Sequence, residues 1–187
     1  RHLLFINSNG MIYLINTNMN VIFTGAITKN KEYFNSLLDG ELIINDKNGG
    51  FINLFAAFDI YYINKNDVRA YSFMPGSLEK DASKCRYPLL KGLIKKLNPI
   101  SYEDPGKNNI SPIRISHKNF YPSNPETTNI FEACNDLIRK FKNNLFEYNT
   151  DGLIFTPAFM GVGSDKIGKA GPLTKNTWEH SFKWKPP

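Results

Sequence analysis

Two lysines near the end of the sequence have a spacing that could serve phosphate chemistry. Residues 181–185 read Ser-Phe-Lys-Trp-Lys, a β-prone run. Side chains alternate between the two faces of a strand, so Lys183 and Lys185 would share one face and lie roughly 6.5–7 Å apart. That separation suits neighbouring phosphates of a nucleotide. The same pattern also fits an edge strand with one apolar face and two solvated lysines.

Two Asp-Gly steps, each leading into an apolar run, could bring carboxylates together. They are Asp39-Gly40-Glu41 in LLDGELI and Asp151-Gly152 in TDGLIFTP. A single Asp-Gly usually marks a turn, and Asp39 is expected to serve mainly as a turn residue. An acidic residue at the mouth of a buried strand costs desolvation energy unless it is paired or binds a cation. Carboxylates that meet in one cleft from separate strands can hold Mg²⁺ through oxygen.

A third candidate is the aromatic ring of Phe58, which precedes Asp59 in the run FAAFDIYYINKNDVR. The run 51–63 is too apolar for a strand with one wet face, so it is expected in the middle of a sheet. There Phe58 could stack on a base. Core packing is the competing interpretation for this ring.

The remaining candidate groups match no catalytic pattern. Residues 161–172, GVGSDKIGKAGP, fit neither G-x-x-x-x-G-K-[ST] nor G-x-G-x-x-G, and are expected to form a mobile loop that reaches phosphate or RNA through Lys166 and Lys169. The three histidines show neither metal nor triad spacing, and no Gly-x-Ser-x-Gly occurs. Cys85 and Cys134 fit no metal or redox spacing, so both are expected to be buried thiols in a reducing, cytoplasmic compartment.

The elements that must position these side chains begin with a β-meander. Short β-prone runs separated by turn formers occupy residues 2–6, 11–15 and 21–25. Further strands are expected at 36–44, 51–63, 112–116, 151–157 and 181–185.

Two helices are expected to interrupt the strands, at 83–97 and 127–145. Each has an apolar stripe at helical spacing, which predicts that each stripe faces the core. Pro88 indicates that the regular part of the first helix begins near that position. The predicted class is α+β, with mostly antiparallel β-sheets flanked by helices, in one domain covering residues 1–187.

Composition favours a polyanionic partner without naming one. The formal net charge is +6, and hydrophobic residues make up 41% of the chain, ample for a core. No apolar run approaches the length of a membrane span, and no signal-peptide pattern occurs, so no membrane partner is expected.

The order of these segments resembles a known superfamily. LLDGELI, FAAFDIYYINKNDVR, TDGLIFTP and FKWKPP are similar to the collinear motifs III, IIIa, IV and V of the covalent nucleotidyltransferases, which include mRNA capping guanylyltransferases and polynucleotide ligases. The Asp-Gly of TDGLIFTP, where ligases usually have Glu-Gly, together with KWKPP, is most similar to the multidomain capping enzymes of large DNA viruses.

The resemblance implies a two-step reaction at a nucleotide. A lysine would take GMP from GTP, and a 5′-diphosphate RNA end would then accept it, with Mg²⁺ or Mn²⁺ as cofactor. Covalently linked triphosphatase and methyltransferase domains are implied in the full-length protein, in a viral factory or virion if it is viral.

The resemblance also assigns roles to individual residues. Lys183 and Lys185 would contact the phosphates, Asp151 would bind metal, and Glu41 would meet the ribose or the metal. Phe58 would stack on guanine.

Arg1 would close motif I, K-x-D-G-x-R, and contact the ribose. The nucleophilic lysine is then expected five positions before Arg1, so the chain is expected to be a piece of a longer protein that does not form the covalent intermediate by itself and lacks the OB-fold domain. Arg69 is a weaker candidate for RNA or phosphate contact.

Two alternatives stay open. One is the adenylation domain of an ATP-dependent polynucleotide ligase, which labelling by GTP or by ATP would separate from a capping enzyme. The other is a relative that binds nucleotide or RNA without catalysis, which replacement of the expected upstream lysine would favour.

Overall fold

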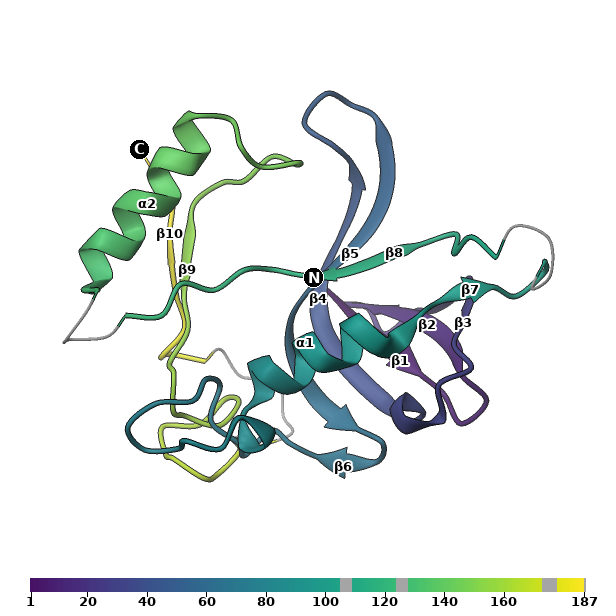
Figure 1. Ribbon diagram of the computed structural model, residues 1–187, viewed down its shortest axis with the longest axis horizontal. Helices are drawn as coiled ribbons and strands as arrows, with labels where there is room; N and C mark the ends of the chain where they lie inside the picture. The colour runs from purple at the N-terminus through teal and green to yellow at the C-terminus, as the bar shows by residue number, and fades with distance from the viewer. Residues whose placement is uncertain (105–108, 124–127, 173–177, 187) are drawn as a thin grey trace.

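The described part of the chain folds into two mainly antiparallel sheets of very unequal size, flanked by two helices (Figure 1). The computed structural model describes residues 1–104, 109–123, 128–172 and 178–186. The large sheet has the strand order β6-β5-β4-β1-β2-β3-β7, with β8 paired to β5. The small sheet consists of β9 and β10.

The large sheet is built mainly from successive hairpins. Its strands are β1 (His2–Ile6), β2 (Met11–Asn16), β3 (Val21–Ile27), β4 (Ser36–Asn45), β5 (Phe51–Ile63), β6 (Asn66–Asp67), β7 (Ile100–Ser101) and β8 (Arg114–His117). The β1–β2 turn closes because the Asn7 side chain accepts hydrogen bonds from the amides of Asn9 and Met11, both at 2.9 Å. Gly10 supplies the left-handed conformation in this turn, with φ of +79°.

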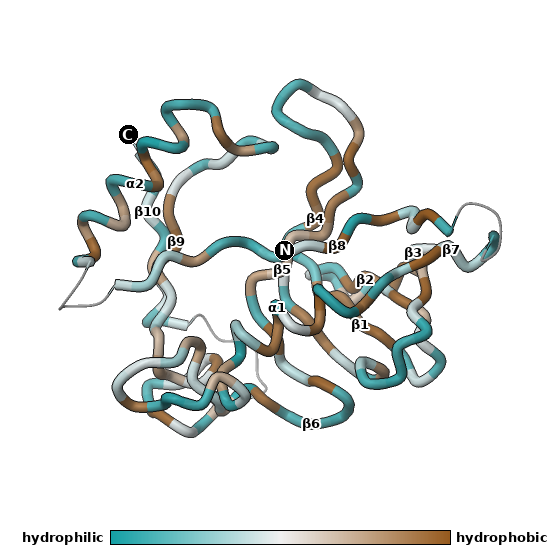
Figure 2. Tube along the Cα trace, in the orientation of Figure 1, coloured by the Kyte–Doolittle hydropathy of each residue, from teal (hydrophilic) through white to brown (hydrophobic). Residues whose placement is uncertain are grey.

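The long strand β5 lies inside the sheet, as its continuous apolar sequence predicts. It pairs antiparallel with β4 along one edge, and with β6 and the parallel strand β8 along the other. Phe55, Ala57 and Ile60 of β5 are fully buried. Figure 2 shows hydrophobic residues along the strands of the large sheet.

The first helix, α1 (Arg86–Leu97), covers one face of the large sheet and follows a short 3₁₀ turn at Ala82–Lys84. Its apolar stripe faces the core as predicted, with Leu90 and Leu93 fully buried. The helix ends at Asn98, which adopts the left-handed conformation typical of a helix C-terminus. It begins two residues before Pro88.

The second helix, α2 (Ile130–Lys142), contradicts the prediction that its apolar stripe faces a core. Phe131 is 76% exposed and Phe141 is 51% exposed. Asn129 and Glu132 form a capping box, so local signals suffice to begin the helix. Most of the stripe faces an open cleft instead of a packed interior.

The small sheet pairs β9 (Leu153–Phe155) with β10 (Phe182–Trp184). Together with α2 it forms a wall beside the large sheet (Figure 1). Both strands are shorter than the runs 151–157 and 181–185 that the sequence indicated. The structure confirms the α+β class with mostly antiparallel pairing, and β8 is the parallel exception.

Candidate active site

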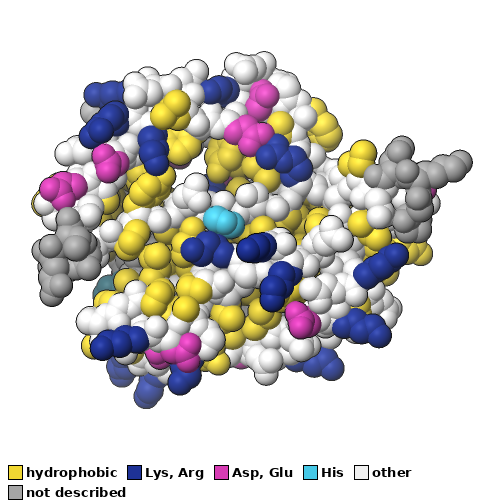
Figure 3. All heavy atoms as spheres, viewed as in Figure 1, with side chains coloured by type: hydrophobic (Ala, Val, Ile, Leu, Met, Phe, Trp, Pro, Cys, Tyr) yellow, Lys and Arg dark blue, Asp and Glu magenta, His cyan; other side chains and the backbone are white. Residues whose placement is uncertain are grey.

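A cleft separates the large sheet from the wall of β9, β10 and α2. Residues of β4, β5 and β8 line one side, and residues of β9, β10 and α2 line the other. Figure 3 shows hydrophobic side chains exposed around this hollow, with Lys, Arg and His side chains near its centre. All the site residues expected from the sequence line it: Arg1, Glu41, Phe58, Asp151, Lys183 and Lys185.

The Asp-Gly-Glu segment lies inside β4 and not in a turn. Gly40 is needed there because β4 and β5 approach each other closely at this position. A Cβ at Gly40 would lie 2.6 Å from the Phe55 ring and 2.7 Å from the Ala56 carbonyl oxygen. The expectation that Asp39 is mainly a turn residue is therefore wrong. Strand pairing demands the glycine, and the two acidic neighbours project from the strand at the cleft.

Asp39 is fully buried and holds Arg1 in place. The Arg1 Nε donates to both carboxylate oxygens, at 3.0 and 3.1 Å, and the Tyr61 hydroxyl also donates to Asp39. The hydrogen bonds that Arg1 donates to Asp39 raise the pKa of Arg1, and burial raises the pKa of Tyr61 far above its usual value. Arg1 therefore carries its charge at the cleft, and Tyr61 stays a donor.

Two irregularities in the β4–β5 ladder redirect aromatic side chains. Asp39 pairs with Asp59 and Gly40 pairs with Ala57, so Phe58 is an extra residue without a partner on β4. Tyr61 likewise has no partner on β4, because Leu37 pairs with Tyr62 and Leu38 pairs with Ile60. Such bulges re-aim a side chain and recur beside active sites. Phe58 is half-buried and lines the cleft.

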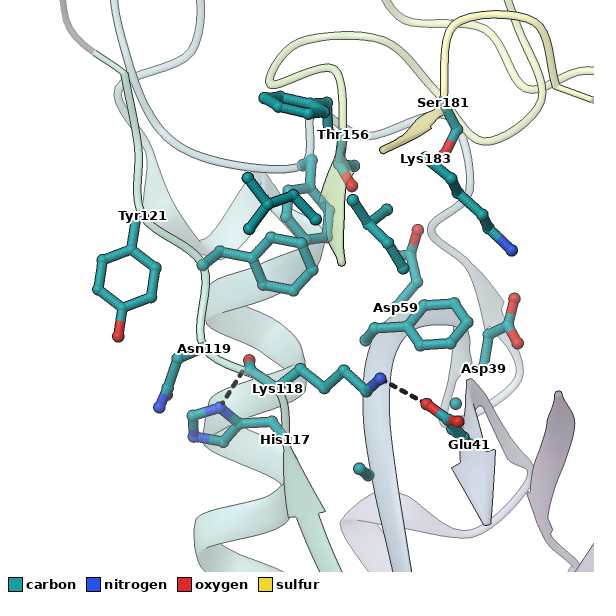
Figure 4. A pocket seen from close by; sticks show the side chains of 18 of the residues that line it. Asp39, Glu41, Asp59, His117, Lys118, Asn119, Tyr121, Thr156, Ser181 and Lys183 are labelled. Atoms are coloured by element: carbon teal, nitrogen blue, oxygen red, sulfur yellow. Dashed lines mark hydrogen bonds and ion pairs between the residues drawn. The ribbon is translucent and has the colours of Figure 1, made fainter. Parts of the chain in front are cut away.

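Lys118, just after β8, was not anticipated from the sequence. Its Nζ lies 2.5 Å from a carboxylate oxygen of Glu41 (Figure 4). Its neighbour His117 also lines the cleft. No local pattern marks Lys118, because its partner Glu41 lies 77 positions away and only the parallel pairing of β5 with β8 brings them together.

The second Asp-Gly step also depends on a close backbone approach. Gly152 has φ of +151°, and a Cβ there would lie 1.9 Å from the Trp184 carbonyl oxygen. Asp151 beside it forms an ion pair with Lys185 at 2.8 Å, and both side chains are mostly exposed. Their hydrogen bond lowers the pKa of Asp151 and raises that of Lys185.

Lys183 differs from Lys118 and Lys185 in its contacts. Figure 4 shows it extending from β10 toward the side of the cleft that holds Asp39 and Asp59. Within the part of the chain that the structure describes, its ammonium group has neither a hydrogen-bond nor an ion-pair partner. An exposed cation in this position can accept a negatively charged ligand without breaking an existing pair.

The carboxylates fit a hard cation in chemistry but are held by lysines here. Asp151 is paired with Lys185, and Glu41 with Lys118. Their side chains are 83% and 50% exposed, so oxygen ligands of the kind that Mg²⁺ prefers are accessible. Over the described residues, no group of three or more His, Cys, Asp or Glu could hold a metal ion, so a metal site at Asp151 and Glu41 stays a prediction.

A backbone hydrogen bond joins the glycine-rich loop to Arg69. The Val162 amide donates to the Arg69 carbonyl at 2.8 Å, and the Trp178 indole donates to the Ser164 carbonyl at 2.9 Å. The Arg69 side chain lines the cleft but is already ion-paired with its neighbour Asp67. The expected phosphate-reaching lysines of this loop do not line the cleft.

The cysteines follow the prediction only in part. Both are free thiols; Cys85 is fully buried, whereas Cys134 is partly exposed on the cleft side of α2. Burial raises the pKa of the Cys85 thiol.

A cleft between two mainly antiparallel sheets, with lysines, carboxylates and an aromatic ring on its walls, is the arrangement that a nucleotidyltransferase domain requires. The family model of the mRNA capping enzyme catalytic domain matches residues 1–187. The chain therefore belongs to the mRNA capping enzyme family and forms its catalytic, guanylyltransferase domain. No curated protein matches the chain. Neither helix in the described ranges is long and apolar enough to cross a membrane.

Proposed function

We propose that this domain transfers GMP from GTP to the 5′-diphosphate end of RNA through a lysyl-GMP intermediate. The observation that carries the proposal is Lys183, which has neither a hydrogen-bond nor an ion-pair partner among the described residues and lines one cleft together with Phe58, Glu41 and Arg1. A nucleotide laid between these walls would meet an aromatic ring at one end and cations at the other. Membership of the mRNA capping enzyme family supports GTP and RNA as the substrates.

In the first step the neutral amine of the lysine expected before Arg1 attacks the α-phosphorus of GTP. A phosphorus–nitrogen bond forms, the bond to the bridging oxygen breaks, and pyrophosphate leaves with the electron pair. The lysine must lose its proton beforehand, and neighbouring positive charge lowers its pKa. Lys183 would stabilise charge on the α-phosphate and Lys185 charge on the departing pyrophosphate.

In the second step a terminal phosphate oxygen of the RNA attacks the same phosphorus. The phosphorus–nitrogen bond breaks, the amine is regenerated, and a GpppN cap forms. A Mg²⁺ or Mn²⁺ ion held by Asp151 and Glu41 would supply further neutralisation of phosphate charge. Arg1, oriented by Asp39, would contact the ribose, while Phe58 would stack on guanine.

The test is covalent labelling by α-labelled GTP in a chain that also includes the K-x-D-G-x segment expected before Arg1. Lys183→Ala should lose at least about 10²-fold in labelling, because one electrostatic contact to the transition state is removed. Lys95→Ala is the matched control, because Lys95 is an exposed lysine of α1 outside the cleft.

Three outcomes would contradict the proposal. Undiminished labelling of Lys183→Ala would remove this lysine from the reaction. Labelling from ATP in preference to GTP would favour the ligase alternative. If the natural protein has another residue where the upstream lysine is expected, a relative that binds without catalysis would be favoured. Similarity to multidomain viral capping enzymes, with linked triphosphatase and methyltransferase domains, stays part of the proposal.

A further inference from the structure

The wall that carries Lys183 is joined to the large sheet at a junction directly after β9. The carbonyl oxygen of Ala158 accepts hydrogen bonds from the amides of Phe73 and Met74, at 2.8 and 3.0 Å. The Ser72 hydroxyl donates to the Phe159 carbonyl oxygen at 3.4 Å. Segment 156–162 is thereby tied to segment 69–76, which follows the β5–β6 hairpin. The junction thus connects the two sides of the cleft.

One fully buried side chain, Arg86, lies at the centre of this junction. Its Nε and Nη2 donate to the two carboxylate oxygens of Asp59, at 2.8 and 3.2 Å. Its Nη1 donates to the carbonyl oxygens of Tyr71 and Met160, the latter at 3.1 Å. A single guanidinium therefore contacts β5, the segment after β6 and the segment after β9.

The geometry of these contacts requires arginine and not merely a positive charge. A guanidinium has five donors in a rigid plane, whereas a lysine ammonium is a point charge on a flexible stem. A lysine at position 86 could keep the ion pair with Asp59, but it could not also reach both carbonyl groups in fixed directions. Because the site is buried, no water would replace the lost donors easily.

Asp59 places this junction directly beside the candidate nucleotide site. It follows Phe58, the bulged aromatic residue of β5, and it lines the cleft itself. The other end of the junction, at Met160, lies five residues after Phe155, the last residue of β9. The path from Phe58 to the Lys183 strand thus runs through Asp59, Arg86 and the segment after β9.

We propose that Arg86 is a positioning residue that fixes the distance between the two walls of the cleft, and so between Phe58 and Lys183. The consequence for catalysis rests on the proposed guanylyltransferase function, whereas the fixed distance does not. Arg86 would touch neither GTP nor RNA, because it is fully buried.

The experiment measures the distance across the cleft by double electron–electron resonance between two spin labels. Ser8→Cys, in the exposed β1–β2 turn, and Phe182→Cys, on the exposed part of β10, place labels outside the cleft lining. Cys134→Ser removes the partly exposed native thiol, and Cys85 is buried. Arg86→Lys should broaden or shift the distance distribution while the far-ultraviolet circular dichroism stays unchanged.

Two further variants separate positioning from a general loss of stability. Leu90→Ala, a core change on α1, should lower the melting temperature but leave the distance distribution as in the unmodified protein. Gly161→Ala should alter the distribution without touching the buried charges, because its new Cβ would lie 2.0 Å from the Lys169 carbonyl oxygen and 3.0 Å from the Arg69 carbonyl oxygen. It therefore tests the junction even if Arg86→Lys fails to fold.

GMP labelling then distinguishes failure of the inference from failure of the proposed function. In the labelling-competent chain, Arg86→Lys should lower kcat/KM for GTP by about 10²-fold, the effect of misplacing reacting groups by an ångström. An unchanged distance distribution in both Arg86→Lys and Gly161→Ala overturns the positioning role. A changed distribution in a protein that never labels with GTP supports the positioning role and contradicts the proposed function.

Discussion

At the scale of single residues, four of the carboxylates that line the cleft divide into two kinds. Asp39 and Asp59 are buried and each is held by an arginine. Asp151 and Glu41 are exposed and each contacts a flexible lysine. A buried carboxylate needs its partner, because an isolated buried charge is expensive, whereas an exposed ion pair contributes little and can be exchanged. Of these four, only Asp151 and Glu41 can exchange their present partner for a ligand at little cost.

Asp151→Asn tests whether the exposed carboxylate binds the metal. The amide keeps the size of the side chain but removes the charge, so the Mg²⁺ concentration for half-maximal GMP labelling should rise about tenfold. The measurement is a Mg²⁺ titration of labelling. Asp165→Asn, an exposed aspartate outside the cleft, is the control and should leave the titration unchanged. An unaltered Mg²⁺ requirement in Asp151→Asn would remove this residue from the ion.

The sequence predicts residues whose role is marked by a local motif, and misses those set by distant contacts. Glu41, Phe58 and Lys183 stand in motifs, and all three line the cleft. Lys118 and Arg86 stand in no motif. Arg86 falls at the start of a predicted helix, and its carboxylate partner lies 27 positions away on another element. Long-range pairing of this kind depends on the sheet register, which local patterns do not specify.

At the scale of elements, the periodicity of apolar residues predicts which segments form helices and strands. It does not predict what each helix or strand packs against. Both helices have an apolar stripe in the sequence, yet α1 packs on the sheet and most of the α2 stripe faces the cleft. Likewise the bulges at Phe58 and Tyr61 give no signal in the sequence. They arise where β5 has more residues than β4 can pair.

Gly40→Ala tests the close approach of β4 to β5. The new methyl group would overlap the Phe55 ring and β5 backbone atoms, so the free energy of unfolding should fall by about 1–3 kcal/mol. Urea unfolding measures it. Gly92→Ala is the matched control, because a Cβ at this position in α1 would meet nothing within 4 Å, and alanine should stabilise the helix by about 0.5–1 kcal/mol. Equal stabilities of the two variants would contradict this account of the Asp-Gly step.

At the scale of the whole molecule, the wall of the cleft is attached to the large sheet at two places in the chain, one before β9 and one after it. After β9 lies the buried junction at Arg86. Before β9, Glu147 forms an ion pair with Arg114 of β8, with contacts of 2.5 and 3.1 Å, and its carbonyl oxygen accepts from the Lys47 amide at 3.0 Å. The second attachment is exposed, so it should yield more readily than the first.

The exposed attachment should weaken in acid, and the sign follows from the pKa of Glu147. Its hydrogen bond with Arg114 lowers that pKa below its usual value of 4.5. A carboxylate with a lowered pKa stabilises the folded state above its unfolded pKa, and this stabilisation is lost as the pH falls through the lower, folded value. The attachment should therefore be intact at neutral pH and lost below about pH 4.5.

Glu147→Gln should reproduce that loss at neutral pH. Because both side chains of the pair are about half exposed, the ion pair contributes only about 0.5 kcal/mol. Hydrogen-exchange protection of the Lys47 amide, measured by NMR, should fall roughly twofold, and its decline in acid should be smaller than in the unmodified chain. Asp136→Asn, which breaks an exposed ion pair within α2, is the control and should leave Lys47 protection unchanged. If Glu147→Gln also leaves it unchanged, the backbone contacts alone fasten the wall before β9, and the two attachments do not differ in the way that their burial implies.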